Sequence, residues 1–234
     1  MNENQPVCVV TGGSAGVGLA IAHKFGDLGY RLVVCGRRQD ALDAAKQSIA
    51  AKGTPCEAIA LDLGIADAVG QLVQTVHEKL GRIDILVNNA GAALCMPVDR
   101  MSKAEFRQTL AVNVEAVFHA TQAVWPVMKE QGQGVIVNIS SLASVDPFPG
   151  FSVYGACKSW VNLFTKATAD EGKPFGIRVY SVALGAVETQ MLRGLFPDFP
   201  DDQTLTPQEV ADFVASLASD AMIPATGQTF LFKK

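Results

Sequence analysis

Short apolar runs rich in β-branched residues alternate along the chain with longer stretches in which apolar residues recur every three or four positions. The short runs predict strands at residues 7–11, 31–35, 56–62, 83–89, 134–140, 177–184 and 228–232. The longer stretches predict helices at residues 16–29, 39–52, 65–80, 102–130, 152–172 and 207–219. Clean alternation of apolar and polar residues is missing from the strands, which is typical of parallel strands buried on both faces.

This order of elements predicts an α/β fold. We expect a single domain over residues 1–234, in which about seven parallel strands form a doubly wound sheet with three helices on each face. The periodic pattern is lost over residues 185–206, the longest irregular segment. Loops of that length in compact domains are usually functional or disordered, so this segment is expected to matter for function.

A glycine-rich turn, "TGGSAGVG" at residues 11–18, joins the first predicted strand to the first helix. Gly12, Gly16 and Gly18 let the backbone approach a phosphate and expose N–H groups at the helix N-terminus. An ordinary turn rarely needs three glycines. The spacing differs from the Gly-x-Gly-x2-Gly pattern of dinucleotide-binding turns, but the wider loop can still bring the backbone close to a phosphate. The turn therefore predicts a dinucleotide site in a Rossmann-type sheet.

The end of the second strand bears on the choice of dinucleotide. An acidic residue commonly holds the ribose 2′-hydroxyl there, but this chain has Gly36 followed by Arg37 and Arg38. A guanidinium binds a 2′-phosphate, which favours NADP(H) over NAD(H). The alternative is that both arginines contact only solvent and bind no phosphate. Asp62, after the third strand, either accepts from the adenine amino group or caps the next turn.

Composition excludes several functions. The 234 residues carry a net charge of −4 without a basic block, which disfavours nucleic acid as a partner. No apolar run approaches the ~18 residues of a membrane span, and the first residues do not resemble a signal peptide. The five cysteines include no CxxC pair, so we expect no metal site and a reducing, cytoplasmic compartment.

The stretch "YGACK" places Tyr154 and Lys158 four residues apart on a predicted helix. Residues at this spacing share one helix face, so the hydroxyl and the ammonium can serve one site. The pair alone is a weak motif, because composition produces it readily by chance.

With these motifs in order, the chain resembles the short-chain dehydrogenase/reductase family over nearly its whole length. The matching motifs are "TGGSAGVG", "NNAG" at 88–91, Asn113 in "LAVNVEA", "NISS" at 138–141, "YGACK" and "GAVET" at 185–189. Ser141 precedes Tyr154 by thirteen residues, the family interval, which Ser140 does not satisfy. Six weak motifs in the right order make coincidence improbable.

The resemblance implies the catalytic roles. Tyr154 would be the acid/base of hydride transfer, and Lys158 would favour its phenolate and hold the nicotinamide ribose. Ser141 would hydrogen-bond the substrate oxygen, and Asn113 would support a water in the proton relay. The implied function is that of an NADP(H)-dependent oxidoreductase acting on a carbonyl or secondary alcohol, such as a ketone or 3-oxoacyl compound.

The resemblance also implies a cofactor half, about residues 1–90, and a catalytic and substrate half, about residues 91–234. The expected cofactor-binding residues are Gly12, Ser14, Gly16, Val17, Gly18, Arg37, Asp62, Leu63, Asn89, Ala90, Gly91, Tyr154, Lys158, Val187 and Thr189. Two features depart from the family: Leu184 stands where proline is usual, and the C-terminus lacks a glycine-rich tail.

Other functions are weaker alternatives. A non-catalytic NADP(H)-binding regulator or scaffold of the same fold would not need the catalytic residues. A methyltransferase has no use for "YGACK".

The substrate itself is expected to be a small molecule, an apolar or extended carbonyl compound or alcohol. The side chains expected at the site mouth are apolar: Leu94, Met96, Phe148, Phe151, Met191, Leu195, Phe196 and Phe199. The alternative for any one of them is a place in the core.

Two further expectations concern assembly and thiols. The helices at 102–130 and 152–172 carry apolar residues on more than one face, which predicts a homo-oligomer, a tetramer or a dimer. The apolar residues on these helices include Phe118, Val124, Trp160 and Phe164. Cys157 and Cys95 are candidate reactive thiols, Cys157 because the nearby Lys158 ammonium would favour thiolate and Cys95 because it follows the "NNAG" strand. The alternative for Cys157 is a buried, inert thiol.

Overall fold

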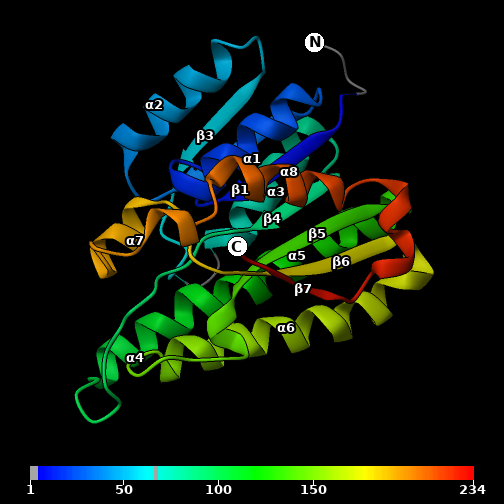
Figure 1. Cartoon of the computed structure of the whole chain (residues 1–234). Coiled ribbons are helices and arrows are strands. Elements are labelled where there is room, and N and C mark those ends of the chain that lie inside the picture. The colour runs from blue at the N-terminus through cyan, green and yellow to red at the C-terminus, as the bar shows by residue number, and fades with distance from the viewer. Residues whose placement is uncertain (1–4, 66–67) are drawn as a thin grey trace.

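The computed structural model describes residues 5–65 and 68–234. Its centre is a seven-stranded sheet in the order β3-β2-β1-β4-β5-β6-β7, with every neighbouring pair parallel (Figure 1). The strands are β1 (Val7–Thr11), β2 (Arg31–Gly36), β3 (Cys56–Ala60), β4 (Ile85–Asn88), β5 (Gly134–Ser141), β6 (Ile177–Leu184) and β7 (Thr229–Phe232). The strand order reverses between β1 and β4, and ligands bind at such a switch point in open α/β sheets.

The helices cover both faces of the sheet. They are α1 (Gly16–Asp27), α2 (Gln39–Ala50), α3 (Ala68–Leu80), α4 (Lys103–Leu110), α5 (Ala116–Gln131), α6 (Ser152–Gly172), α7 (Gln190–Leu195) and α8 (Pro207–Ser216). Helices α1, α2 and α8 share one apolar cluster with the sheet, and α3, α5 and α6 share the other. The predicted doubly wound fold is therefore confirmed over the described residues.

Alternate strand residues enter different clusters. Val10 and Val34 pack beneath α1 and α2, whereas Val9 and Val33 pack on the opposite face. Both faces of these strands are thus buried, which explains why the strands are apolar throughout.

The predicted helix at 102–130 is divided in three. Ser102 and Glu105 form a capping box that begins α4, and a π-helical turn, η1 (Ala111–Glu115), connects α4 to α5. Helix α5 ends where Gly132 adopts a left-handed conformation, with φ of 69°. The π-helical turn contains Asn113, and such turns are frequent at functional sites.

The prediction of an irregular loop at 185–206 is partly wrong. The segment contains α7, and Val187 pairs with Leu205 in an isolated parallel bridge. Six residues are too few for a helical period to stand out in the sequence. Residues 66 and 67 of the predicted helix 65–80 lie outside the described residues. None of the helices described is long and apolar enough to cross a membrane.

Candidate active site

The glycine turn after β1 is shaped to receive a phosphate. Gly12 and Gly16 have positive φ angles of 65° and 52°, and a Cβ atom at Gly18 would lie 2.2 Å from the Gly12 carbonyl oxygen. Ala15 caps α1 without any side-chain acceptor, so no side chain satisfies the N–H groups of the first turn. Those donors and the positive end of the helix suit a dinucleotide pyrophosphate. Ser14 and Val17 lie in the same turn.

The "NNAG" segment holds this turn in place. The Thr11 hydroxyl oxygen accepts hydrogen bonds from the backbone N–H groups of Asn89 and Ala90, each at 3.0 Å. The Asn89 side chain donates to the carbonyl oxygens of Thr11 and Gly12 at 2.9 and 3.2 Å. The Asn89 amide therefore serves the turn itself.

The end of β2 has free space next to two polar side chains, those of Ser14 and Arg37. A Cβ atom at Gly36 would lie 3.2 Å from Ser14 Oγ, so Gly36 leaves space beside that hydroxyl. Arg37 is exposed and has no hydrogen-bond or ionic partner among the described residues. A 2′-phosphate in this space would find Ser14 and Arg37 as donors, so the residues present fit NADP(H).

Asp62 and Leu63, which follow β3 and were both expected to bind the cofactor, each contact other parts of the protein. The Asp62 carboxylate accepts a hydrogen bond of 2.9 Å from the Gly64 N–H, which is the turn-capping alternative. Asp62 is exposed, so its cofactor role stays a prediction. Leu63 packs its side chain into the core, which leaves only its backbone for a cofactor.

Asn113 is fully buried and bonds to backbone on two sides. Its Nδ2 donates to the carbonyl oxygens of Ala92 and Thr109, each at 2.9 Å, and its Oδ1 accepts from the Ala92 N–H at 3.3 Å. A Cβ atom at Gly91 would lie 3.0 Å from Asn113 Oδ1 and 3.4 Å from Lys158 Nζ. The fold thus brings Gly91, Asn113 and Lys158 to one place.

Ser141 and Tyr154 meet at the end of β5. Their side chains hydrogen-bond to each other, and the Ser141 oxygen also accepts from the Ala143 N–H at 3.2 Å. Lys158 Nζ donates to the Ile139 carbonyl oxygen at 2.9 Å. Ser140 instead donates to the Lys158 carbonyl oxygen at 3.2 Å, as a buried structural contact.

Burial controls the pKa of Tyr154 in the protein without cofactor. Burial raises the pKa of the phenol to about 12, although the hydrogen bond from Ser141 acts against this shift. Lys158 Nζ lies 5.7 Å from the centre of the Tyr154 ring, and burial lowers the pKa of this ammonium to about 8. In the protein without cofactor, desolvation therefore dominates and keeps the phenol protonated, and the expectation that Lys158 and the oxidised cofactor favour phenolate stays a prediction.

The segment after β6 faces the glycine turn. A Cβ atom at Gly16 would lie 3.3 Å from Thr189 Cγ2, and Thr189 caps α7 by accepting from the Leu192 N–H. Val187 is buried and held by its bridge to Leu205. Leu184, which stands where the family usually has proline, is the last residue of β6 and pairs with Ser141 of β5. Strand β6 therefore extends as far as the site although the proline is missing.

A line of aromatic rings leads away from Tyr154. Phe151 lies 5.7 Å from Tyr154 between ring centres, and Phe148 lies 5.7 Å from Phe151. Phe196 stacks on Phe151 at 6.1 Å, and Phe199 follows Phe196 at 6.5 Å. Four of the eight residues expected at the site mouth thus lie in one line of rings that begins at Tyr154, and Phe151 among them is buried.

The two candidate thiols differ in exposure. Cys157 is buried and burial raises its pKa, despite Lys158, so the expectation of a thiolate there is wrong. Cys95 is exposed, with Sγ 4.0 Å from the Pro149 carbonyl oxygen.

A thiol-modifying reagent is therefore expected to label Cys95, to inhibit the enzyme, and to leave Cys157 unmodified in the native state. Bound NADP(H) should slow the inhibition. Mass spectrometry of labelled protein checks the position, with Cys95→Ser as the control. Undiminished activity after complete labelling of Cys95 would contradict this prediction.

No group of three metal-binding side chains is found among residues 5–65 and 68–234.

The comparisons agree with this geometry. A family model described as short chain dehydrogenase matches residues 6–199. The 3-oxoacyl-[acyl-carrier-protein] reductase of Synechocystis sp. is 36% identical, over 96% of this chain and 94% of that protein. An uncharacterized oxidoreductase of Bacillus subtilis, YxjF, is 34% identical over 95% of this chain and 94% of its own length. A crystal structure of actinorhodin polyketide ketoreductase with NADPH superposes with a TM-score of 0.93 at 29% identity, covering 98% and 96% of the two chains.

A Rossmann-type sheet with a serine, a tyrosine and a lysine at the carboxyl end of β5 defines an oxidoreductase of the short-chain type. The chain belongs to the short chain dehydrogenase family. The predicted resemblance is confirmed.

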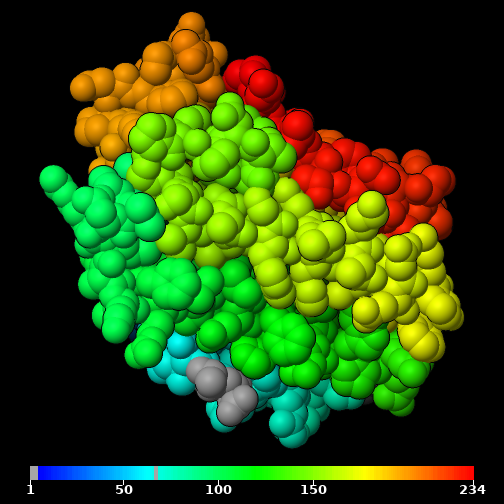
Figure 2. Space-filling view, turned by 90° about the horizontal axis from the view of Figure 1, so that it is seen from below, coloured from blue at the N-terminus to red at the C-terminus, as the bar shows by residue number. Residues whose placement is uncertain are grey.

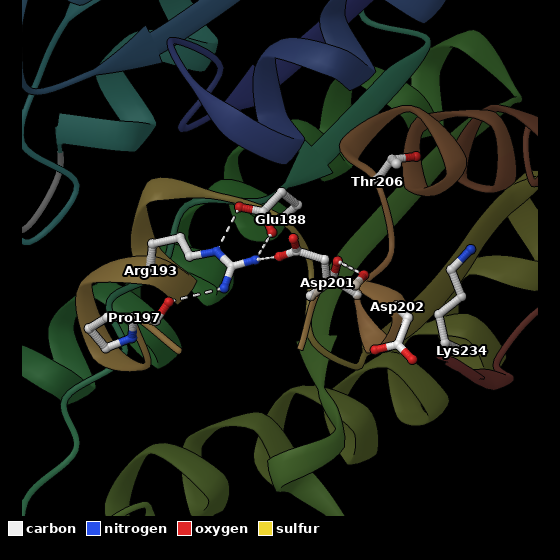
Figure 3. A pocket seen from close by; sticks show the side chains of 8 residues that line it. Glu188, Arg193, Pro197, Asp201, Asp202, Thr206 and Lys234 are labelled. Carbon is white, nitrogen blue, oxygen red and sulfur yellow. Dashed lines mark hydrogen bonds and ion pairs between the residues drawn. The ribbon is translucent and has the colours of Figure 1, made fainter. Parts of the chain in front are cut away.

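The sequence did not single out Arg193 of α7, which Figure 3 shows among the side chains that line a pocket, next to Glu188 and Asp201. The arginine stands in a segment without periodicity, and its acceptors lie on both sides of it in the sequence. Only the fold of the segment reveals them.

Proposed function

We propose that this protein is an NADP(H)-dependent reductase of ketones or related carbonyl compounds. The observation that carries the proposal is the convergence of Asn113, Ser141, Tyr154 and Lys158 beside a phosphate-shaped glycine turn. The related ketoreductase contains NADPH, and the Synechocystis relative is a 3-oxoacyl reductase, which support the cofactor and the reaction.

The bound cofactor would supply a hydride to the carbonyl carbon. Because the hydroxyls of Ser141 and Tyr154 are in hydrogen-bond contact, one carbonyl oxygen can receive both. Tyr154 then gives its proton from Oη to that oxygen, and its raised pKa keeps the phenol in the required acid form. Lys158 holds the ribose side of the site and stabilises the phenolate left behind.

Asn113 would act in the relay through its backbone. Its side-chain amide is engaged with Ala92 and Thr109. A π-helical turn takes carbonyl groups out of the regular helical ladder, so they can accept from water. The remaining cofactor contacts, at Gly12, Gly16, Gly18, Val187 and Thr189, are part of the same proposal, with the cofactor half at about residues 1–90 and the catalytic half at about 91–234.

The substrate is proposed to be apolar, since the aromatic line ends at Tyr154. A panel of ketones and aldehydes of increasing apolar size, mixed with NADPH and followed by the loss of its absorbance, tests the function. Reduction of apolar ketones is expected. If no carbonyl compound is reduced while NADPH still binds, the alternative of a non-catalytic NADP(H)-binding protein is correct.

We also propose a homo-oligomer, a tetramer or a dimer, built on α5 and α6. Figure 2 shows these helices as green and yellow-green surface on one face of the molecule. Phe118 is 39% exposed and Leu163 is 69% exposed, and Trp160 and Phe164 stack at 4.6 Å beside them. Val124, on the same helix as Phe118, is buried in the core. Exposed apolar side chains of this kind favour burial against a second copy.

Light scattering at micromolar concentration is expected to give a mass of at least twice the 24.8 kDa of one chain. Phe118→Glu should shift the mass towards the monomer, because it would bury a charge in the interface. Leu28→Glu, an exposed position at the end of α1, is the matched control and should leave the mass unchanged. A monomer in the native protein would contradict the prediction.

The location is proposed to be cytoplasmic. All five cysteines are free, as expected in a reducing compartment.

A further inference from the structure

Helix α7 and the residues after it have little apolar anchorage. None of the α7 residues is buried, and Met191 and Phe196 are 50% and 36% exposed. A helix of six residues is also too short to be stable by itself. Polar contacts must therefore hold this segment, residues 188–201, against the site.

One guanidinium makes most of those contacts. Arg193 Nε and Nη2 donate to the two carboxylate oxygens of Glu188 at 2.9 and 2.5 Å. Its Nη1 donates to the carbonyl oxygens of Phe199 and Pro197 at 2.6 and 3.2 Å, and Nη2 also contacts the Asp201 carboxylate. Figure 3 shows the arginine reaching between these groups. The side chain is 28% exposed, so solvent screens these bonds only in part.

Two of the groups that accept hydrogen bonds from Arg193 lie close in sequence to Phe196, a ring of the proposed substrate mouth. Pro197 and Phe199 follow Phe196 in the sequence, and their carbonyl oxygens accept hydrogen bonds from the guanidinium. Phe196 stacks on Phe151, which contacts Tyr154. At the base, Thr189 lies against the glycine turn, and Val187 is bridged to Leu205. The position of the Phe196 ring therefore depends on the arginine.

We propose that Arg193 is a positioning residue that clamps residues 188–201 and holds Phe196 and Phe199 as the apolar wall of the substrate mouth. The wall contacts large carbonyl substrates and does not reach small ones, so Arg193 sets the preference for apolar size. This inference rests on the proposed reductase function, because the wall matters only for a substrate that reaches Tyr154.

Arginine suits this task better than lysine. A guanidinium has five N–H donors in a planar fork, which can bind carboxylates and carbonyl groups together. A lysine at this position would keep the charge but hold fewer acceptors. Arg193→Lys should therefore hold residues 188–201 in place only in part.

The test compares two diketones that share a reacting acetyl group, 2,3-butanedione and 1-phenyl-1,2-propanedione. In Arg193→Gln we expect the KM for the phenyl compound to rise about 10- to 100-fold, the size of effect that displaced positioning groups produce. The kcat for both compounds and the KM for butanedione should change by less than about threefold, because Tyr154 is untouched. Arg193→Lys should fall between Arg193→Gln and the native protein.

Two controls separate positioning from general damage. Arg178→Gln also removes an arginine that donates to two carbonyl oxygens, those of Ala218 and Ser219, but far from the mouth. It should leave both KM values unchanged. Phe196→Ala should reproduce the effect of Arg193→Gln, and the double variant should be no worse than either single variant, because both remove the same wall.

Hydrogen exchange gives a readout independent of turnover. Amides of residues 189–203 should exchange about tenfold faster in Arg193→Gln than in the native protein or in Arg178→Gln. Unchanged exchange there overturns the clamp. Equal losses for both diketones, or additive losses in the double variant, overturn the link to substrate size. If the native protein reduces neither diketone, the proposed reductase function fails for this substrate class, and the exchange experiment still decides the clamp.

Discussion

Replacing Tyr154 with phenylalanine is expected to lower kcat by about 10²- to 10⁴-fold, the usual contribution of a general acid. The affinity for NADPH should stay nearly unchanged, because the phenol gives its proton only during the reaction. The hydroxyl contacts Ser141, and the ring contact with Phe151 survives the substitution. Steady-state kinetics and a binding titration with NADPH measure the two effects.

Tyr180→Phe is the matched control. The Tyr180 hydroxyl donates to the Met222 carbonyl oxygen at 2.7 Å, so the same change there removes one structural hydrogen bond. It should reduce stability by about 1 kcal/mol and leave kcat close to native. A Tyr154→Phe variant that retains more than about a third of native kcat would refute the assignment, because general acid catalysis is worth far more.

Lys158→Ala should differ from Tyr154→Phe by weakening NADPH binding as well. Lys158 lies beside Gly91 and Asn113, where the cofactor half meets the catalytic half. A loss of kcat alone would place this lysine outside the cofactor site.

The second large effect concerns the choice of cofactor. Native protein should prefer NADPH over NADH by roughly 10- to several-hundred-fold, since one or two hydrogen bonds to a charged group contribute ~1.5–3 kcal/mol each. Arg37→Ala should raise the KM for NADPH and leave the KM for NADH almost unchanged. Arg38→Ala tests whether the neighbouring arginine matters, and we expect a much smaller effect.

Gly36→Asp should reverse the preference. Gly36 does not have a positive φ, so an aspartate can adopt its backbone conformation. The new Cβ would lie 3.2 Å from Ser14 Oγ, so the hydroxyl must move by a few tenths of an ångström. A carboxylate there repels a 2′-phosphate and can accept from a ribose hydroxyl. Comparable use of NADH and NADPH by the native protein would show that Arg37 is only solvated.

Local features of the sequence determined the sheet, its helices and the candidate catalytic residues. The buried parallel strands are apolar on both faces, so seven runs are visible without tertiary information. The glycine turn is visible because its backbone needs positive φ, and the Tyr154–Lys158 pair is visible because helical spacing is fixed. The family resemblance then gave Ser141 and Asn113 their expected roles.

Other features depend on residues that are distant in sequence, and only the tertiary structure decided them. Burial raises the pKa of the Tyr154 phenol in the protein without cofactor, and burial of Cys157 removes the expected thiolate. Val124 faces the core and Phe118 is 39% exposed, although the helix pattern did not say which of the two faces inward. Desolvation depends on every element packed around a group, and a local pattern cannot supply this information.

The segment after β6 shows the same limit. Its sequence carries no period, and its order depends on the bridge between Val187 and Leu205 and on the contacts of Arg193 with Glu188 and Phe199. The bridge joins the two ends of the segment, and the arginine contacts join residues five and six positions apart, a spacing that no regular helix or strand period predicts. Local propensity therefore predicted an irregular loop, whereas the bridge and these hydrogen bonds order it.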